Sequence, residues 1–512
     1  MQHPKFTVES EGQGAPAVCE VEIGSDANSC AEDNRTATPS IYYILLVITL
    51  FLLIIPIWIV RYPGMVDYFN HLTRCYIIAH YNENPIWQER YIVVHAPIPN
   101  LAMDVIAVPL MHLFPPEISG KIVLTIAALL YGIGCSAVGK AILGRPNWLA
   151  LVAALTFYNS ALLYGFVNYM FGVAMFLCAF AVWLRVHKTM SVLSFALCGG
   201  LGILTFLSHL AGFALLAVAC LTVAVSEFVR DRKIAALLAK IGWLACPMPL
   251  MAAFMKAGGR VGSIEWSTAK EKLIFLFAPV RSYSMVADIA LVLILLVCAL
   301  VILKKSTVHP AAMVGLVFFV LLLISPKILF GSSGADARFA VPMYLLFLLA
   351  VEPRWTKWQK AALVVACCAM VMRLGLITST WREISHRSEQ ALAIGRVLPD
   401  GARIYVIPPT ADVPKLDRSL AHVSTLWTIS QQAALSSLFA NPGQQPLVFR
   451  QLPCPVIEGV RCFSKYDYIW AYDPPDGLRR EVSSIASPVA SWQGITLWRV
   501  NRASYEYRAS YQ

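Results

Sequence analysis

The chain has 512 residues, of which 58% are hydrophobic and 14% are charged. Soluble globular proteins carry about 25% charged residues and about 45–50% apolar ones, so this composition excludes a water-soluble protein with one or two cores. The formal net charge of +11 does not indicate nucleic-acid binding, because most Lys and Arg lie in short loops between apolar runs. The 13 cysteines form no CxxC pair and no Cys/His spacing of a zinc site.

Residues 1–40 are polar and are predicted to form a disordered cytoplasmic tail. Apolar runs of about 17–25 residues follow, each long enough to cross a bilayer. The sequence predicts a polytopic α-helical membrane protein with about 11 transmembrane helices within residues 41–378. The predicted spans are 41–60, 118–138, 147–163, 167–186, 191–208, 210–228, 236–255, 286–303, 309–325, 338–352 and 358–378.

The basic residues between these spans predict their orientation, because short cytoplasmic loops are rich in Lys and Arg. Alternate loops are all basic if the N-terminus is cytoplasmic: they contain Lys140, Arg185, Arg230, Lys304 and Arg354. We therefore expect a multi-pass protein of the cell membrane, of the bacterial inner-membrane type. An odd number of spans places the C-terminus outside the cytoplasm.

Residues 379–512 are predicted to form a small extracytoplasmic α/β domain. A helix is expected over 382–397, and strands over 403–408, 446–450, 467–472 and 494–499, with turn residues between them. An oxidising compartment would permit a local disulfide between Cys454 and Cys462. No catalytic motif is evident in this segment.

The predicted outer loop 61–117 contains the most informative segment. If the chain is helical after Pro63 and Gly64, then Asp67, Asn70, His71 and Arg74 lie at i, i+3, i+4 and i+7, on one face. One interpretation is an amphipathic helix lying on the membrane surface. The other is a site for proton transfer and anion binding, because this set of side chains serves both.

Asp104 is the second acidic residue of interest in this loop. Its neighbours are apolar on both sides, and an ionisable group in such surroundings indicates a functional site. The alternative is that Asp104 pairs with Arg74 or another basic residue and only fixes the loop.

Three further residues lie near the predicted outer ends of spans. His209 sits at a tight turn between two spans, where a structural role competes with a catalytic one. Asp336 and Arg338 precede the tenth predicted span. Arg binds phosphate through paired hydrogen bonds, so Arg338 is a candidate for holding a lipid phosphate, unless it contacts ordinary lipid headgroups.

The segments Asp67-Tyr-Phe-Asn-His-Leu-Thr-Arg74 and Asp336-Ala-Arg338-Phe resemble bacterial proteins of the GT-C superfamily of membrane glycosyltransferases. Trp381-Arg382 and Leu398-Pro-Asp-Gly-Ala-Arg403 resemble the junction between the last span and the external domain in that group. The span count, the orientation and an acidic residue in the first outer loop are similar as well. The first loop lacks the Asp-Glu or Asp-Asp pair of the protein mannosyltransferase branch.

This resemblance implies an inverting transfer of sugar from a polyprenyl-phosphate donor to an envelope glycan, lipid or protein acceptor. Asp67 would be the general base, with His71 and Asp104 supporting it. Asn70, Arg74, His209, Asp336 and Arg338 would bind substrate, and Arg338 would neutralise the departing phosphate. The scheme requires no metal and no cofactor besides the lipid-linked donor. The expected partners are that donor, membrane lipids and the acceptor.

Two other functions remain open at this point. A transporter or flippase of lipid-linked glycans would place polar or broken segments near the bilayer midplane, often in repeated halves. The sequence shows no convincing internal repeat, and its polar candidates gather at one face of the membrane. A non-catalytic scaffold of a polysaccharide assembly complex is the third alternative.

Overall fold

The computed structural model describes residues 38–256, 264–329, 332–409, 418–440, 442–455 and 459–501. The chain divides into two units, residues 1–44 and 45–512, and the following concerns the second. The predicted disordered tail lies outside the described residues, apart from its last three, which begin helix α2 (Thr38–Trp58).

Six helices in the described part of the chain are long and apolar enough to cross a membrane. A seventh span results if the bent pair formed by α12 (Ile234–Ile241) with η4 (Gly242–Ala245) and α13 (Met248–Lys256) is counted. The chain is therefore a multi-pass membrane protein. The six helices are α2, α6 (Pro116–Leu143), α9 (Val167–Val186), α11 (Leu210–Asp231), α15 (Met285–Leu303) and α18 (Lys357–Ala393).

The other predicted spans fall on shorter apolar helices. The region 147–163 contains α7 (Leu149–Leu155) and α8 (Ser160–Tyr164), because the chain turns between them at Asn159. The regions 191–208, 309–325 and 338–352 contain α10 (Val192–Ser208), α16 (Ala312–Ile324) and α17 (Ala340–Leu349). One short apolar helix, α5 (Ala102–Met111), lies in the predicted outer loop. The helix lengths alone do not decide whether the chain has eleven membrane spans.

Small residues allow two of the helices to approach closely. A Cβ atom at Gly212 of α11 would lie 2.7 Å from the carbonyl oxygen of Gly172 in α9. A Cβ at Gly172 would lie 2.8 Å from the Cβ of His209, so the start of α11 is held directly against α9. Close backbone approach at small residues is a usual way for membrane helices to pack.

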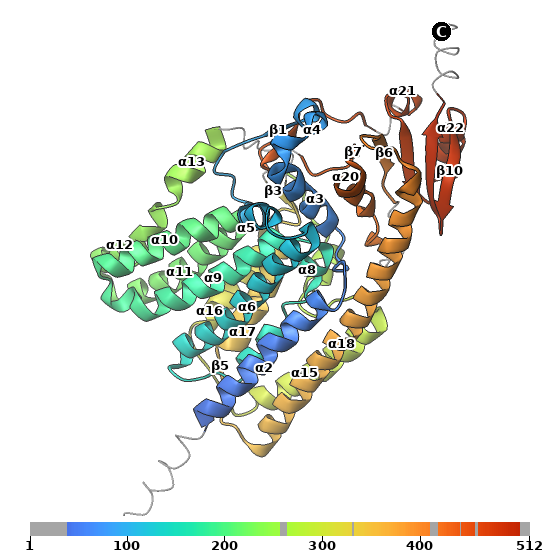
Figure 1. Ribbon diagram of the computed structural model, residues 1–512. Helices are drawn as coiled ribbons and strands as arrows, with labels where there is room; N and C mark the ends of the chain where they lie inside the picture. The colour runs from blue at the N-terminus through green and yellow to red at the C-terminus, as the bar shows by residue number, and fades with distance from the viewer. Residues whose placement is uncertain are drawn as a thin grey trace, which may run out of the picture. The chain divides into compact units, whose positions relative to one another are not determined.

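Helix α18 leads from the helical part of the chain to a sheet near the C-terminus (Figure 1). This five-stranded mixed sheet has the order β10-β11-β9-β6-β7. Strand β6 is parallel to β7 and β9, whereas β9, β11 and β10 are successively antiparallel. The strands are β6 (Arg403–Ile407), β7 (Ala434–Leu435), β9 (Tyr468–Tyr472), β10 (Ala486–Trp492) and β11 (Ile495–Val500).

Three of the four predicted tail strands belong to this sheet, but the segment 446–450 does not. Its strand β8 (Leu447–Phe449) pairs antiparallel with β1 (Tyr91–Val93) of the first long loop. Apolar side chains from both segments, including Trp87, Tyr91, Leu438 and Leu447, form a small core beneath this pair. The sequence did not predict this pairing, because the two strands lie more than 350 residues apart.

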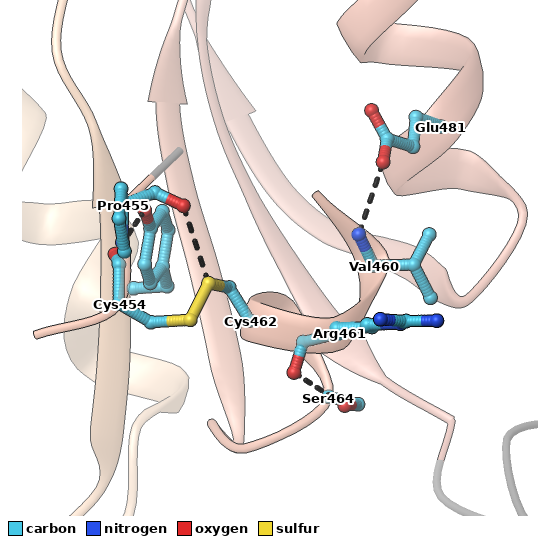
Figure 2. The surroundings of a disulfide bond; sticks show 8 residues. Cys454, Pro455, Val460, Arg461, Cys462, Ser464 and Glu481 are labelled. Atoms are coloured by element: carbon cyan, nitrogen blue, oxygen red, sulfur yellow. Dashed lines mark hydrogen bonds between the residues drawn. A yellow bond between two sulfur atoms is a disulfide. The ribbon is translucent and has the colours of Figure 1, made fainter. Parts of the chain in front are cut away.

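A disulfide joins Cys454 to Cys462, with 5.6 Å between the Cα atoms (Figure 2). The Tyr405 hydroxyl on β6 donates a hydrogen bond of 2.9 Å to the Cys454 carbonyl. On the other side, the Val460 N–H donates to a Glu481 carboxylate oxygen at 3.0 Å. The bridge therefore ties the segment after β8 to α21 (Val460–Phe463), the short helix that precedes β9.

Candidate active site

Helix α3 (Tyr68–Ala79) and the residue before it, Asp67, carry the predicted polar stripe, and the stripe does not face solvent. Asp67, Asn70, His71 and Arg74 are all buried, and the exposed fractions of Asn70 and Arg74 are 0%. Helices α5 and α6 pack against α3, and so do η7 (Val423–Leu426) and α20 (Trp427–Gln431) of the tail. The alternative of an amphipathic helix on the membrane surface is therefore wrong.

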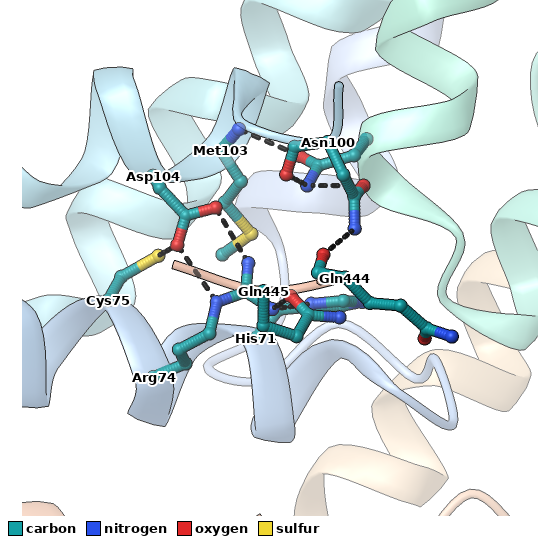
Figure 3. Close-up of polar contacts among 9 residues, drawn as sticks. His71, Arg74, Cys75, Asn100, Met103, Asp104, Gln444 and Gln445 are labelled. Atoms are coloured by element: carbon teal, nitrogen blue, oxygen red, sulfur yellow. Dashed lines mark hydrogen bonds and ion pairs between the residues drawn. The ribbon is translucent and has the colours of Figure 1, made fainter. Parts of the chain in front are cut away.

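Arg74 and Asp104 form a closed ion pair at the C-terminal part of this stripe (Figure 3). The Arg74 Nε donates to Asp104 Oδ1 at 2.8 Å, and Nη2 donates to Oδ2 at 2.7 Å. Arg74 Nη1 also donates to Gln445 Oε1. The burial of Arg74 opposes its charge, but Asp104 outweighs this and raises the Arg74 pKa. This geometry favours the alternative in which Asp104 fixes the loop by pairing with Arg74.

His71 is held neutral beside this pair. Its Nδ1 lies 2.9 Å from Arg74 Nη1, a group that can only donate, so Nδ1 accepts and the proton is on Nε2. Burial, and then the positive charge of Arg74, lower the pKa of His71 well below its ordinary value. A histidine that cannot take up a proton near neutral pH is a poor general base, so the geometry favours a supporting role.

Asn70 connects α3 to the tail. Its Oδ1 accepts a hydrogen bond of 2.6 Å from the Phe439 N–H, and its Nδ2 donates to the Ser437 carbonyl at 2.9 Å. These two bonds fix which way the amide points. Nδ2 also lies 3.2 Å from His422 Nδ1, so this ring nitrogen accepts, and the proton of neutral His422 is on Nε2.

Asp67 lies at the other end of the stripe, just before α3, and its carboxylate does not cap the helix. The Asp67 N–H donates to the Tyr164 carbonyl at 3.0 Å, and a Cβ at Gly165 would lie 2.8 Å from the Asp67 Cβ. Gly165 has φ of +105°, which glycine adopts readily. The Asp67 carboxylate is therefore held against the turn between α8 and α9.

Among the described residues, the ion-pair contact of this carboxylate is with His422. The distance from His422 Nε2 to Asp67 Oδ1 is 3.5 Å, longer than a good hydrogen bond. Within the described residues, no other ion pair or side-chain hydrogen bond engages the carboxylate. Asp67 thus keeps capacity to accept a proton, unlike Asp104, whose oxygens are both engaged by Arg74.

Arg338, in η5 (Ala337–Phe339), contacts two aromatic residues of the same turn. Its guanidinium carbon is 5.9 Å from the centre of the Phe166 ring and 5.8 Å from that of Tyr169. The Tyr169 hydroxyl donates to the Arg338 carbonyl at 2.6 Å. Asp67 and Arg338 therefore flank one short turn, residues 164–169, from two different parts of the chain.

The turn also reaches His209 and Asn100. The His209 ring packs edge-on against Tyr169 at 5.7 Å, and its Nδ1 accepts the Ala211 N–H at 3.0 Å. His209 therefore caps α11, which is the structural alternative considered for it. Asn168 donates to the Asn100 carbonyl at 2.7 Å and accepts the Met103 N–H at 2.7 Å, which positions the start of α5.

Asp336 is separate from this group. It is fully buried, accepts the Ala337 N–H at 2.9 Å and pairs with Lys272 at 3.0 Å. Lys272 also donates to two backbone carbonyls, those of Leu322 and Ser325. These contacts favour a role for Asp336 in shaping the segment that carries Arg338, rather than direct contact with substrate.

Sequence reasoning missed His422, Asn168, Tyr169 and Lys272. None of them lies in a motif, and each meets its partner through contacts between distant segments; 352 residues separate Asn70 from His422, for example. The described residues contain no group of three or more His, Cys, Asp or Glu side chains placed to hold a metal ion. The expectation of transfer without a metal or cofactor stays a prediction.

No protein-family model and no curated protein sequence matches the chain. Among solved structures, it is similar to the crystal structure of ArnT from Cupriavidus metallidurans bound to undecaprenyl phosphate. The TM-score is 0.50 and the sequence identity is 12%, and the match covers 90% of this chain and 98% of that chain. At this identity the likeness concerns the fold. ArnT is a GT-C glycosyltransferase, and the chain has the GT-C fold, as the sequence resemblance predicted.

Proposed function

We propose that the chain transfers a sugar from a polyprenyl-phosphate donor to an envelope glycan, lipid or protein acceptor at the outer face of the membrane. The observation that carries this proposal is the position of Asp67: a buried carboxylate with one loose partner, on a turn that Arg338 flanks. The GT-C fold supports it, because the similar ArnT structure holds undecaprenyl phosphate.

Asp67 acts as the general base in this scheme. Its carboxylate removes the proton from the acceptor hydroxyl, and the oxygen attacks the anomeric carbon of the donor sugar. The bond from that carbon to the phosphate oxygen breaks, and the polyprenyl phosphate leaves with the electron pair. The configuration at the anomeric carbon inverts, because attack and departure occur on opposite faces.

Arg338 neutralises the negative charge that grows on the leaving phosphate. A guanidinium matches phosphate geometry through paired N–H groups, and the faces of Phe166 and Tyr169 keep it oriented. His422 supports Asp67, because the Nε2–H of its neutral form points to the carboxylate without occupying both of its oxygens. Asn70, His71, Arg74 and Asp104 act as positioning residues, as do His209 and Asp336.

The proposal includes eleven spans, with the shorter helices and the bent pair completing the six long ones. Residues 379–512 then form an extracytoplasmic α/β domain, joined to the first loop by the β1–β8 pair. The disulfide between Cys454 and Cys462 supports this side, because disulfides persist in oxidising compartments. Reporter fusions at Lys188 and Gln512 should report opposite sides, and a cytoplasmic signal at Gln512 contradicts the orientation.

The decisive experiment uses purified protein, a polyprenyl-phosphate sugar and candidate acceptors. Asp67→Asn keeps the shape of the side chain but removes its basicity, so transfer should fall by about 10²–10⁴-fold while thermal stability and donor binding stay nearly unchanged. Arg338→Ala should also weaken donor binding. Asp476→Asn, at an exposed position of α22 (Asp476–Ser483), is the matched control and should retain full activity.

Two outcomes would remove this assignment. Robust transfer by Asp67→Asn would exclude Asp67 as the base and leave α3 with a structural role. Wild-type protein that moves a labelled lipid-linked sugar across vesicles without transferring it would instead identify a transporter. A flippase also predicts that Asp67→Asn leaves transfer by a separate enzyme unaffected once substrate is supplied outside.

A further inference from the structure

A cavity lined by basic side chains lies where the first loop meets the tail. Its volume is about 440 Å³, and its walls come from the end of α4 (Pro85–Arg90) with β1, from β6 and β7, and from segments 449–454 and 465–466. Volumes of 300–1,000 Å³ are typical of small-molecule pockets. Four basic side chains line it: Arg90, Arg403, Arg450 and Lys465.

The four basic groups differ in how far they are already neutralised. Arg403 is engaged by Asp467 through bonds of 3.0 and 2.9 Å, so its charge is compensated. Arg450 donates its Nε to the Gln88 carbonyl at 2.7 Å, a neutral acceptor. Lys465 makes no ion pair within the described residues and is exposed. Only Glu89, also exposed, contributes an acidic group to the lining.

Arg90 is the most informative of the four. Its Nε is buried and has no hydrogen-bond partner among the described residues. A buried N–H without an acceptor destabilises the fold, and more so when the group is charged. Arg90 lines the cavity together with Arg450 and Lys465, and it forms no ion pair among the described residues, so an oxyanion in the cavity would bring it a counter-charge.

The remaining walls suit a saccharide more than a bare anion. Phe449, on β8, is partly exposed in this lining, whereas Tyr91, on the paired strand β1, is buried and packs against it with ring centres 5.2 Å apart. Aromatic side chains with a few polar groups are the usual lining of small-molecule sites. Cys454 and Tyr466 complete this wall, and the disulfide fixes the position of Cys454.

We propose that this cavity binds an anionic saccharide through its phosphate or carboxylate group, with Arg90, Arg450 and Lys465 contacting the anion. The site does not include Asp67. It is joined to α3 by one segment of the tail: Ser436 lines the cavity, and the next residue, Ser437, accepts the hydrogen bond from Asn70. If the chain is a sugar transferase as proposed above, the cavity is a subsite for an acidic acceptor.

The test measures direct binding to the purified full chain by titration calorimetry, with four probes: glucose 6-phosphate, glucuronate, glucose and inorganic phosphate. The two acidic sugars should bind, glucose should not, and inorganic phosphate should bind more weakly than glucose 6-phosphate. The two acidic sugars distinguish a phosphate from a carboxylate as the preferred group. Equal binding of glucose and the acidic sugars would overturn the proposal, and so would phosphate binding as tightly as its sugar ester.

Arg90→Gln and Lys465→Gln should each weaken binding of the acidic sugars by at least about tenfold, since each removes a charge-assisted bond. Arg479→Gln, on α22 and outside the cavity, is the matched control and should bind as the wild type does. Lys465 is exposed, so its variant keeps the test valid if Arg90→Gln fails to fold. Unchanged binding in Lys465→Gln and a folded Arg90→Gln overturns the proposal.

Asp67→Asn separates this inference from the proposed function. This variant should lose transfer but bind the acidic sugars normally, because Asp67 does not line the cavity. Normal binding in a wild-type protein that transfers no sugar would refute the proposed function and leave the anion site standing. A protein that transfers sugar but does not bind the acidic sugars would refute the anion site and leave the proposed function standing.

Discussion

The two ends of the polar stripe on α3 are built from similar side chains but differ in how completely they are engaged. At one end, Asp104 receives two hydrogen bonds of 2.7 and 2.8 Å from Arg74, and its charge is compensated. At the other, Asp67 faces His422 at 3.5 Å and keeps free acceptor capacity. A closed pair stabilises the fold, whereas a carboxylate that must take up a proton needs an oxygen that no neighbour occupies.

The largest expected effect is at the closed end. Arg74→Met leaves Asp104 buried without its counter-charge, and breaking a buried pair in this way costs about 3–5 kcal/mol. We expect a large fall in the thermal unfolding temperature of the detergent-solubilised protein. The double variant Arg74→Met with Asp104→Leu should recover much of the loss, because both charges are gone. A single variant as stable as the wild type would show that the pair is not closed.

The contact between the stripe and the tail should show the next largest effect. Asn70→Ala leaves the Phe439 N–H and the Ser437 carbonyl without their partner, at a cost of about 1–3 kcal/mol. Thermal unfolding measures this loss. Asn82→Ala, at an exposed position of η2 (Tyr81–Glu83), is the control and should stay within about 0.5 kcal/mol of the wild type.

A double-mutant cycle on transfer activity tests whether His422 acts through Asp67 at the open end of the stripe. His422→Gln should reduce transfer in the wild type but have much less effect when Asp67 is already Asn, because the ring acts through the carboxylate. A coupling energy of about 1 kcal/mol is expected for two side chains in contact. Independent, multiplying effects would show that His422 does not act on Asp67, and the difference between the two ends would then rest on Asp67 alone.

The smallest expected effect concerns pH and His71. Burial and the positive charge of Arg74 lower its pKa in the folded protein, whereas the unfolded chain takes up this proton below about pH 6.5. The unfolded state therefore binds more protons as the pH falls, and the free energy of unfolding decreases by about 0.7 kcal/mol between pH 7 and pH 6. Chemical unfolding at pH 7 and pH 6 should show a smaller decline for His71→Gln. Parallel declines in both proteins would indicate that His71 is protonated in the fold.

Local patterns in the sequence predicted the long helices and the polar stripe. The spacing of Asp67, Asn70, His71 and Arg74 is enough to place them along one helix, since it depends only on the helical repeat. The six long spans could be located because each contains an uninterrupted apolar run. The turn at Asn159 and the kink between α12 and α13 shorten other runs, so the span count stayed undecided.

Local sequence patterns could not predict the contacts between segments that are distant in the chain. Whether Asp104 pairs with Arg74 or stays free for chemistry depends on how α5 packs against α3, and the sequence left both alternatives open. His422 carries no motif, and its importance comes only from the way the tail folds over α3. The strand around Leu447 was predicted correctly as a strand, but not the partner it pairs with, because strand propensity does not encode the choice of neighbour.

The pairing of β1 with β8 can form only late in synthesis, because β8 lies near the C-terminal end of the chain. Asn70 and His422 are 352 residues apart, and ribosomes add about 5–20 residues per second. The first loop therefore waits roughly 20 to 70 seconds after synthesis before its partner exists. During that time Asn70 lacks its tail partners, the Phe439 N–H and the Ser437 carbonyl, whereas Arg74 and Asp104 can already pair. Premature termination between residues 394 and 421 yields a chain with every long membrane helix but without His422 and the rest of the tail that contacts α3.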